Sequence, residues 1–282
     1  MSKFKLTADN YYSLEANMAY MSCSQFKDFR KCEAATLAEL RGEWEKPKTT
    51  ALLVGSYVDA YFSGELEQFK AEHPEMYKKD GTLKVDFEKA QAICERLDRD
   101  ELARMLLSGK HQTIKTGTIA GVAYKAKFDS LLTSRQVEAI CKKYPQIREL
   151  VPLGGPMIVD LKCMKDFEPV WDEHAEEKVS FIEFWGYDTQ GAIYQHLDGR
   201  HAPFVIVGAT KEAETDIDAF YVPDEDMAFP FAEVEALSPR YAAIKRGEIE
   251  PEGCGKCAYC RGTKRLSSIK PYNQFKYQEE LL

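Results

Sequence analysis

Asp160 and Lys162 have the residue types and the spacing of a catalytic pair. They close the stretch from Gly154 to Lys162, which predicts a turn followed by a short apolar strand. Residues two apart on a strand point to the same face, so the carboxylate and the ammonium would enter one site together. A carboxylate can hold a divalent cation, and the ammonium can orient or deprotonate a water or offset the charge of a phosphate. Taken alone, the pair is more often a solvated strand end, so its interpretation depends on further acids reaching it.

Two more carboxylates interrupt apolar segments. Asp129 lies at the apolar end of a predicted strand over residues 122–132, where a carboxylate must be solvated, paired or metal-bound. Asp59 is the only charge in residues 50–63, a mostly apolar segment of helical length, and solvent exposure is its simplest reading. If the strands that carry Asp129 and Asp160 are adjacent, both acids can hold one cation. That arrangement is typical of a metal-dependent phosphodiesterase, in which the metal acidifies a water and a lysine assists the attack.

Gln190 and Tyr194 are the next candidates. They lie four residues apart within residues 176–197, which we predict to be a helix, and they therefore share a face. An amide and a phenol on one face can position a nucleic-acid backbone or the catalytic groups. The alternative is an ordinary polar stripe on a half-buried helix.

The strongest local pattern is formed by Cys254, Cys257 and Cys260, at C-x2-C-x2-C spacing in a Gly-rich, basic loop. Thiols in such a loop have little to gain from burial and fit metal ligation well. A tetrahedral zinc ion and a four-iron cluster both require four thiolates, so the spacing does not choose between them, and the fourth ligand must come from elsewhere. Cys32 lies within a helix predicted to begin at Ser22, where a small buried hydrophobic residue is its simplest reading.

These residues must be positioned by alternating helices and strands. Helical periodicity with capping signals predicts the helices, and period-two alternation predicts the strands. Residues 1–20 have no clear period and predict an irregular lead-in, and residues 64–82 predict a surface excursion with turns. The remaining predictions are a helix over 84–107, a hairpin over 110–132, a helical connection over 134–150, strands over 203–209 and 216–222, and a last helix over 223–246.

Composition limits the class of protein. With 282 residues, 44% of them hydrophobic, the chain can bury the core of one large domain or two small ones. No apolar run approaches the length of a membrane span and the N-terminus lacks a signal-peptide pattern, so we predict a cytoplasmic protein with no membrane partner. Its eight cysteines then read as thiols or metal ligands rather than disulfides. A net charge of −8 argues against indiscriminate binding to polyanions and leaves room for a local basic groove.

The candidate residues form one ordered set along the chain: Gly55-x3-Asp59, Asp129, Asp160-x-Lys162 and Gln190-x3-Tyr194. This set resembles the PD-(D/E)XK nuclease superfamily, in particular the RecB-like and RecE-like exonucleases of phages and prophages. In that family a helix-borne histidine usually follows the Gly-x3 spacing, and Asp59 stands in its place here. The Gln-x3-Tyr motif matches fully.

The cysteines extend the resemblance. A subgroup that includes AddB and the CRISPR-adaptation nucleases holds a four-iron cluster with one cysteine before the nuclease core and three after it. Cys32, followed by Cys254, Cys257 and Cys260, reproduces that layout. The resemblance therefore implies a 4Fe-4S cluster at these four residues, with Zn2+ as the alternative.

The resemblance also implies a fold. It is an α/β (α+β) fold with a restriction-endonuclease-like core, in which a mixed central β-sheet is flanked by helices and the strand after Leu150 lies near its centre. The likeness covers about residues 22–265. We predict a single nuclease domain over residues 1–282, with an N-terminal helical lead-in over 1–50 and a Cys-rich segment over 250–266 that the metal site joins.

The implied activity is hydrolysis of DNA phosphodiester bonds by an Mg2+- or Mn2+-dependent exonuclease. Lys162 would orient or activate the water, and Gln190 and Tyr194 would position the strand. The substrate would be duplex ends or single strands of DNA in phage-type recombination, with an annealing protein as a possible partner and a homo-oligomer as a possible assembly. The implied ligands of the divalent ion are Asp59, Asp129, Asp160 and the carbonyl of Leu161.

A non-catalytic nucleic-acid-binding protein with a cysteine-ligated zinc or iron-sulfur site is the alternative. Its support is a group of basic residues around the cysteines that can contact phosphates: Lys256, Arg261, Lys264 and Arg265. A protein that only binds does not need Asp129, Asp160 and Lys162 in one site. Convergence of these three side chains therefore separates the two hypotheses.

Overall fold

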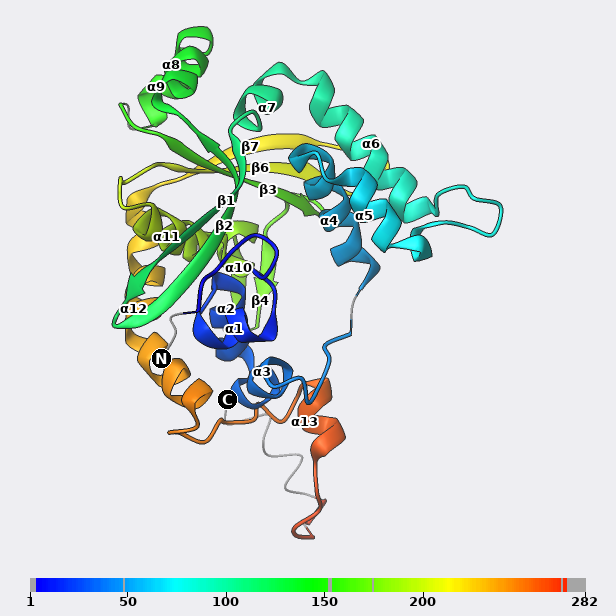
Figure 1. The fold of residues 1–282 in the computed structure, drawn as a ribbon, viewed down its shortest axis with the longest axis vertical. Coiled ribbons are helices and arrows are strands. Elements are labelled where there is room, and N and C mark those ends of the chain that lie inside the picture. Colours follow the sequence, from blue (N-terminus) through cyan, green and yellow to red (C-terminus); the bar gives the residue numbers. More distant parts are fainter. Residues whose placement is uncertain (1–3, 48, 152–153, 174, 270, 273–282) are drawn as a thin grey trace.

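A five-stranded mixed sheet forms the centre of the fold (Figure 1). The computed structural model describes residues 4–47, 49–151, 154–173, 175–269 and 271–272. The strands are β1 (Lys110–Ile119), β2 (Val122–Leu132), β3 (Met157–Met164), β6 (Phe204–Thr210) and β7 (Ile217–Val222), in the spatial order β1-β2-β3-β6-β7. β3 and β6 are parallel and the other neighbours are antiparallel, so the predicted fold class and the central place of β3 are confirmed.

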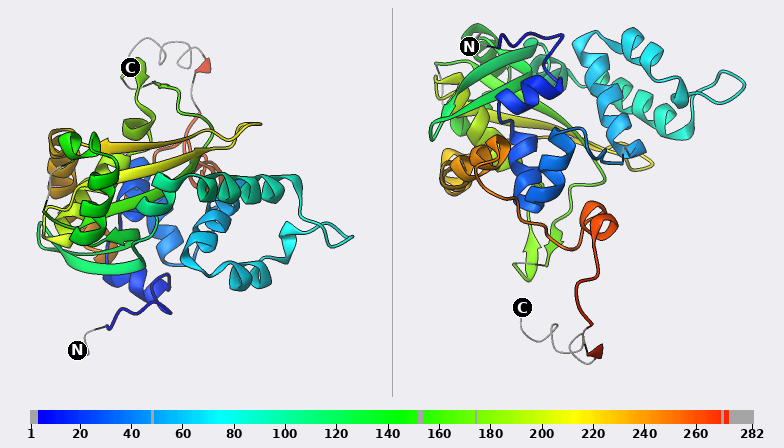
Figure 2. Two further views of the ribbon diagram at one scale, coloured as in Figure 1. Left: turned by 90° about the horizontal axis from the view of Figure 1, so that it is seen from above. Right: turned by 60° about the horizontal axis from the view of Figure 1, so that its bottom comes forward.

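Helices cover both faces of the sheet. α4, α5 and α6 form a lobe beside it, and α11 and α12 lie against it on another side (Figures 1 and 2). The helices before β1 are α1 (Leu14–Ala19), α2 (Cys23–Lys31), α3 (Glu33–Leu40), α4 (Thr50–Ser63), α5 (Leu66–Glu72), α6 (Val85–Arg99) and α7 (Glu101–Leu106). Those after β2 are α8 (Ser134–Lys143), α9 (Ile147–Leu150), α10 (Phe181–Phe184), α11 (Tyr187–Asp198), α12 (Asp224–Arg246) and α13 (Ala258–Thr263).

The two faces of β3 contribute to different hydrophobic cores. Val159 and Leu161 pack into a core with α4, α6, α7 and α8. Ile158, with Phe204 and Ile206 of β6, packs into a second core with α2, α11 and α12. Because side chains on a strand alternate between faces, Asp160 shares the face of Ile158 and is directed towards α11.

Several sequence predictions of local structure are wrong. Cys32 does not lie inside a helix, because its backbone is extended (φ −165°, ψ 104°) and separates α2 from α3. The helix predicted over 84–107 is divided at Asp100, whose side chain caps α7 by accepting a hydrogen bond from Ala103 N. Residues 64–82 are mostly exposed, as predicted, but they also contain α5 and a short 3-10 helix at Pro74–Met76. Residues 176–197 contain β5 (Glu177–Val179), paired with β4 (Val170–Asp172), and then α10 and α11.

The N-terminal segment is anchored to the core rather than irregular. Lys125 is buried, and its Nζ donates to the carbonyl of Tyr11 and, over 2.7 Å, to Asn17 Oδ1. Lys245 Nζ donates to the carbonyls of Asn17 and Tyr20 at 2.7 and 2.8 Å. Burial lowers the pKa of Lys125 to about 8 and that of Lys245 to about 7. These contacts fix α1, which lies within residues 1–20, where the absence of a clear period predicted an irregular lead-in.

The remaining predicted elements are confirmed, with ends that differ by at most one residue: the helix over 50–63, the hairpin over 110–132, the helical connection over 134–150, the two later strands and the last helix. In the part of the chain that the structure describes, no helix combines the length and the apolar character needed to cross a membrane. The prediction of one domain over residues 1–282 includes residues outside the described ranges, and it stays a prediction.

Candidate active site and cysteine cluster

A cleft opens where β2 and β3 separate. The two strands pair only from Ser130 to Leu132 on β2 and from Met157 to Val159 on β3. Backbone pairing stops beyond Ser130 and Val159, and there Asp129 Oδ2 accepts a hydrogen bond from Leu161 N at 3.0 Å. A side-chain oxygen thus takes the place of the backbone carbonyl that would accept this bond in a continuous pair of strands. The resulting cleft has a volume of about 770 Å³ and is lined by β2, β3, α11, α4, α5 and the N-terminal segment.

Asp160 and Lys162 project into this cleft together, as their spacing predicts. Asp160 is 1% exposed, its Oδ1 accepts a hydrogen bond from Gln190 Nε2 at 2.6 Å, and its Oδ2 forms an ion pair with Lys162 Nζ. Lys162 Nζ also lies 5.3 Å from the ring centroid of Tyr187 at the start of α11. Local sequence pattern does not single out Tyr187, although it comes three residues before Gln190 on the same helix.

Asp59 and Asp129 line the same cleft from α4 and β2, and both are half-buried. Burial raises the pKa of Asp59 to about 6, with the charge of Asp160 adding to the effect. Burial and the charges of Asp160 and Asp59 raise the pKa of Asp129 well above its ordinary value. Burial alone would lower the pKa of Lys162, but Asp160, Asp129 and Asp59 together raise it above the usual lysine value. The three acids therefore share one electrostatic site with one lysine.

α11 holds Gln190 and Tyr194 on the face that meets the sheet. Tyr194 Oη donates to the carbonyl of Lys127 at 3.3 Å, and its ring packs on Phe128 with centroids 4.8 Å apart. Burial, followed by the charges of Asp160 and Asp129, raises the pKa of Tyr194 well above its ordinary value. Gly191 permits the close approach of α11, because a Cβ there would lie 2.5 Å from Phe204 Cδ1.

The carboxylates fit a hard divalent cation. Buried acids that raise one another's pKa are destabilised as anions, and a cation between them relieves that cost. Mg2+ needs only one or two protein carboxylates, since it keeps several waters and takes further oxygens from phosphate.

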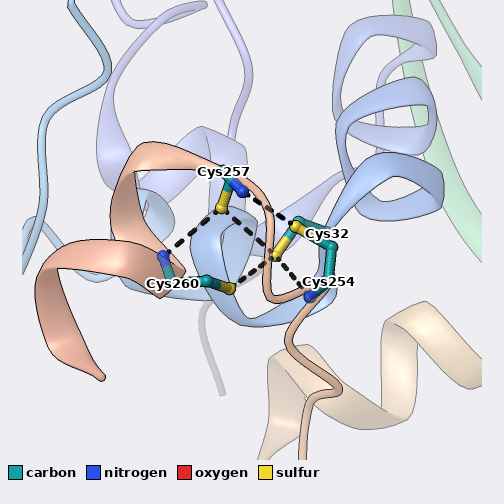
Figure 3. A group of neighbouring side chains, drawn as sticks. All are labelled: Cys32, Cys254, Cys257 and Cys260. Atoms are coloured by element: carbon teal, nitrogen blue, oxygen red, sulfur yellow. Dashed lines mark hydrogen bonds between the residues drawn. The ribbon is translucent and has the colours of Figure 1, made fainter. Parts of the chain in front are cut away.

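The four cysteines of the sequence prediction come together at one place (Figure 3). Their sulfurs all lie within 4.8 Å of one another, although Cys32 is more than two hundred residues from the others. Cys32 Sγ lies 3.6 Å from Cys260 Sγ and 3.8 Å from Cys257 Sγ. Four thiolates about 2.3 Å from one tetrahedral ion stand about 3.8 Å apart, so the set as it stands fits a single ion such as zinc. A four-iron cluster is larger and requires the sulfurs to separate.

Backbone amides support the sulfurs as they do in metal-thiolate loops. The amide of Cys254 donates to Cys32 Sγ at 3.4 Å, and the amide of Cys257 donates to Cys254 Sγ at 3.3 Å. Hydrogen bonds from the backbone of Lys256 and Cys257 lower the pKa of Cys254 to about 6, which favours its thiolate. Burial raises the pKa of Cys260 to about 12.

A polar network fastens the C-terminal segment beside the cluster. Arg240 forms a two-point ion pair with Glu33, with N–O distances of 2.7 and 2.9 Å, and also contacts Glu252 at 2.9 Å. The amide of Glu252 donates to Glu33 Oε2 at 2.8 Å. Glu33 begins α3 directly after Cys32. The network therefore joins the start of α3 to the segment around Glu252, next to the cysteines.

Comparison with known proteins agrees with this fold and site. A family model described as a PDDEXK-like domain of unknown function matches residues 22–149 and 150–263 of the chain. The chain belongs to this PDDEXK-like family. Membership confirms the resemblance to the PD-(D/E)XK superfamily that the ordered motifs indicated.

A solved structure is similar to this PDDEXK-like protein in sequence and in fold. It is the crystal structure of a protein from Eubacterium rectale named "Putative exonuclease", whose sequence is 38% identical and whose fold matches with a TM-score of 0.84. The match covers 96% of this chain and 98% of that chain. No curated protein matches the chain.

The basic residues of the predicted DNA contact lie elsewhere on this PDDEXK-like fold. They are exposed and belong to the segment around α13, and the residues that line the cleft do not include them. Their role stays a prediction, as does that of the Leu161 carbonyl. The four residues are Lys256, Arg261, Lys264 and Arg265.

Proposed function

We propose that this protein is a metal-dependent DNA exonuclease. The observation that carries the proposal is the convergence of Asp129, Asp160 and Lys162 in one cleft, with Gln190 hydrogen-bonded to Asp160. A protein that only binds nucleic acid has no need to gather these groups against their mutual electrostatic cost. The exonuclease name of the Eubacterium rectale protein adds support at 38% identity.

Asp129 and Asp160, with Asp59 and the Leu161 carbonyl, are the proposed ligands of one or two Mg2+ or Mn2+ ions. When bound, a divalent ion supplies Lewis-acid chemistry, because it polarises a phosphoryl oxygen and makes water more acidic. Asp160 is already oriented by Gln190, so its second oxygen remains directed towards Lys162 and the cleft. Asp129 is oriented by the amide of Leu161 in the same way.

Lys162 orients the attacking water and offsets the charge of the phosphate. The surrounding carboxylates raise its pKa, which favours the ammonium form, and an ammonium donates hydrogen bonds to a water and to phosphate oxygens. Tyr194 and Gln190 position the strand and the acids from α11. Tyr194 stays a neutral phenol because its pKa is raised as well.

The cysteines take no part in this chemistry in our proposal. They hold a structural metal centre that joins α3 to the C-terminal segment. The layout shared with the iron-sulfur subgroup favours a 4Fe-4S cluster, and the sulfur separations of 3.6 and 3.8 Å favour zinc. The exposed basic residues around α13 then lie at a fixed place, where they can contact DNA outside the cleft.

Digestion of linear and circular duplex DNA with Mg2+ or EDTA tests the function. We expect linear DNA to disappear in Mg2+ and circular DNA to survive, because an exonuclease needs an end. Binding without cleavage would favour the nucleic-acid-binding alternative, and cleavage of circles would indicate an endonuclease. A role in phage-type recombination, with an annealing protein as partner and a homo-oligomeric assembly, completes the proposal and rests on the family resemblance.

Asp59→Ala is expected to raise the Mg2+ concentration for half-maximal activity by about tenfold or more, because it removes a ligand. In the native protein this concentration should also rise as the pH falls through about 6, since a protonated Asp59 cannot bind a cation. Asp59→Ala should lose that part of the pH dependence. Mg2+ titrations at several pH values measure both effects.

Glu67→Ala is the matched control for this prediction. Glu67 is also a helix acid, and its side chain is 87% exposed on α5. The substitution should leave the Mg2+ requirement unchanged. If Asp59→Ala behaves like Glu67→Ala, then Asp59 is not a ligand.

A further inference from the structure

The N-terminal wall of the cleft carries two tyrosines that the proposed chemistry does not use. Tyr11 is buried, whereas Tyr12 leaves 69% of its surface exposed. The two rings pack edge to face with centroids 4.9 Å apart, and both line the cleft that contains Asp129 and Asp160. An exposed ring that is supported by a second ring offers a surface on which a flat group can stack.

Lys127 connects these rings to the carboxylates. It precedes Asp129 by two residues on β2, and its Nζ lies 4.5 Å from the ring centroid of Tyr12 and 5.5 Å from that of Tyr11. Attraction to the two rings keeps the ammonium at the cleft wall. A stacking surface, a cation and a group of carboxylates therefore follow one another along one side of the cleft.

The stacking surface is held in place by the core. The carbonyl of Tyr11 accepts a hydrogen bond from the buried Lys125, and Ser13 caps α1 directly after Tyr12. The amide of Met21 donates to the carbonyl of Ala123 at 2.8 Å, so the segment also runs beside β2. A ring that is fixed before binding loses little conformational entropy when a ligand stacks on it.

The charges of the two walls differ. Glu65 and Glu72 line the cleft from α5 and the turn before it. α5 belongs to the helical lobe, apart from the N-terminal segment (Figure 1). A phosphate backbone is repelled by these carboxylates and attracted by Lys127. Asp28 and Glu39 line the cleft from α2 and α3, and Asp28 is paired with Lys46. Lys127 is therefore a cation beside Tyr12 that can attract the backbone of a bound strand.

We infer that Tyr12, supported by Tyr11 and Lys127, is the subsite for an unpaired nucleotide next to the cleaved phosphate, so that a strand is cleaved where it is single-stranded, including the frayed end of a linear duplex. The inference rests on the proposed nuclease function and specifies its substrate. Every base has a face that can stack on an aromatic ring, so the subsite accepts any sequence. In a duplex the base faces are covered by neighbouring pairs, and only a frayed or single-stranded end presents a free one.

Binding of a strand with bases is compared with binding of a strand without them. The full-length protein, without added Mg2+ or Mn2+, is titrated into fluorescein-labelled oligo-dT and into an abasic oligonucleotide of equal length, and anisotropy gives each Kd. The native protein should prefer oligo-dT. Tyr12→Ala should reduce the preference by about 5- to 150-fold, which is the effect of losing one stacked base. Tyr12→Phe should retain the preference, because the ring is kept.

Phe229→Ala is the matched control, because Phe229 is an aromatic residue of α12 with 81% exposure that does not line the cleft. It should keep the native preference. Equal affinity of the native protein for both strands, or a full preference in Tyr12→Ala, would overturn the subsite. If the protein prefers oligo-dT over the abasic strand through Tyr12 but cleaves no DNA, only the nuclease function is overturned. If it cleaves DNA without this preference, only the subsite is overturned.

Discussion

Replacement of Asp160 by Asn or of Lys162 by Ala is expected to abolish DNA cleavage and to leave the protein folded. Asp160→Asn removes the charge of a proposed metal ligand, and Lys162→Ala removes the ammonium that orients the water. Loss of one such group lowers kcat/KM by about 100-fold or more. The rate of digestion of linear DNA in saturating Mg2+ measures the effect.

The fold should survive both changes. In Asp160→Asn the remaining side-chain oxygen can still accept the hydrogen bond from Gln190, and the size of the residue is conserved. The side chain of Lys162 is 21% exposed at the cleft, so Lys162→Ala leaves no closed cavity in either hydrophobic core. Far-UV circular dichroism and the melting temperature check these expectations.

Two exposed residues provide matched controls for these variants. Asp86→Asn, in the first turn of α6, and Lys165→Ala, just after β3, change the same residue types outside the cleft. Both should keep the native rate. A native rate in folded Asp160→Asn or Lys162→Ala would contradict the active site as drawn.

Most of the site could be predicted because short-range periodicity determines it. The two-residue period of a strand places Asp160 and Lys162 together, and the helical period places Gln190 and Tyr194 on one face. The prediction that Asp129 and Asp160 share one site held only if β2 and β3 are neighbours in the sheet. The sequence does not determine the order of strands in a sheet, so it could not establish this condition. The separation of these strands at Asp129, which opens the cleft, depends on a side chain that replaces a backbone acceptor. Local pattern carries no sign of such a replacement.

The break at Cys32 shows where local pattern fails. Residues 22–40 contain no Gly or Pro, so the sequence reads as one helix. The extended backbone at Cys32 is maintained by distant partners, because Glu33 pairs with Arg240 and the amide of Cys254 reaches Cys32 Sγ. Tertiary contacts more than two hundred residues apart thus override helix propensity.

The cleft wall formed by Tyr11 and Tyr12 was missed for a similar reason. Residues 1–20 show no regular period, and their structure depends on hydrogen bonds to Lys125 and Lys245. One signal was available: Lys125 and Lys127 share a face of a strand whose other face is apolar, just before Asp129. Two lysines on one face of a half-buried strand need partners for their charges. Their position just before Asp129 therefore indicates that another segment covers this face, but the sequence does not show which segment.

Replacement of Cys32 by Ser is expected to release the metal of the cysteine cluster and to lower the melting temperature. A metal centre at these cysteines closes a loop around almost the whole nuclease core, and the cost of closing a loop grows slowly with its length. By the entropic model used for disulfides, a link across so long a loop stabilises the fold by about 5 kcal/mol. At about 2–4 °C per kcal/mol for a chain of this size, the melting temperature should fall by about 10–20 °C. The ion pairs of Arg240 remain, so the variant should still fold.

Protein purified without oxygen provides the test of this prediction. Native protein with a 4Fe-4S cluster would be brown and contain iron and sulfide, whereas a zinc site would give a colourless protein with one zinc per chain. In either case Cys32→Ser should lose the metal. Cys141→Ser is the control, because this buried cysteine of α8 lies outside the cluster and its replacement can lower stability only through packing. Full metal content and a native melting temperature in Cys32→Ser would mean that Cys32 is an ordinary buried residue.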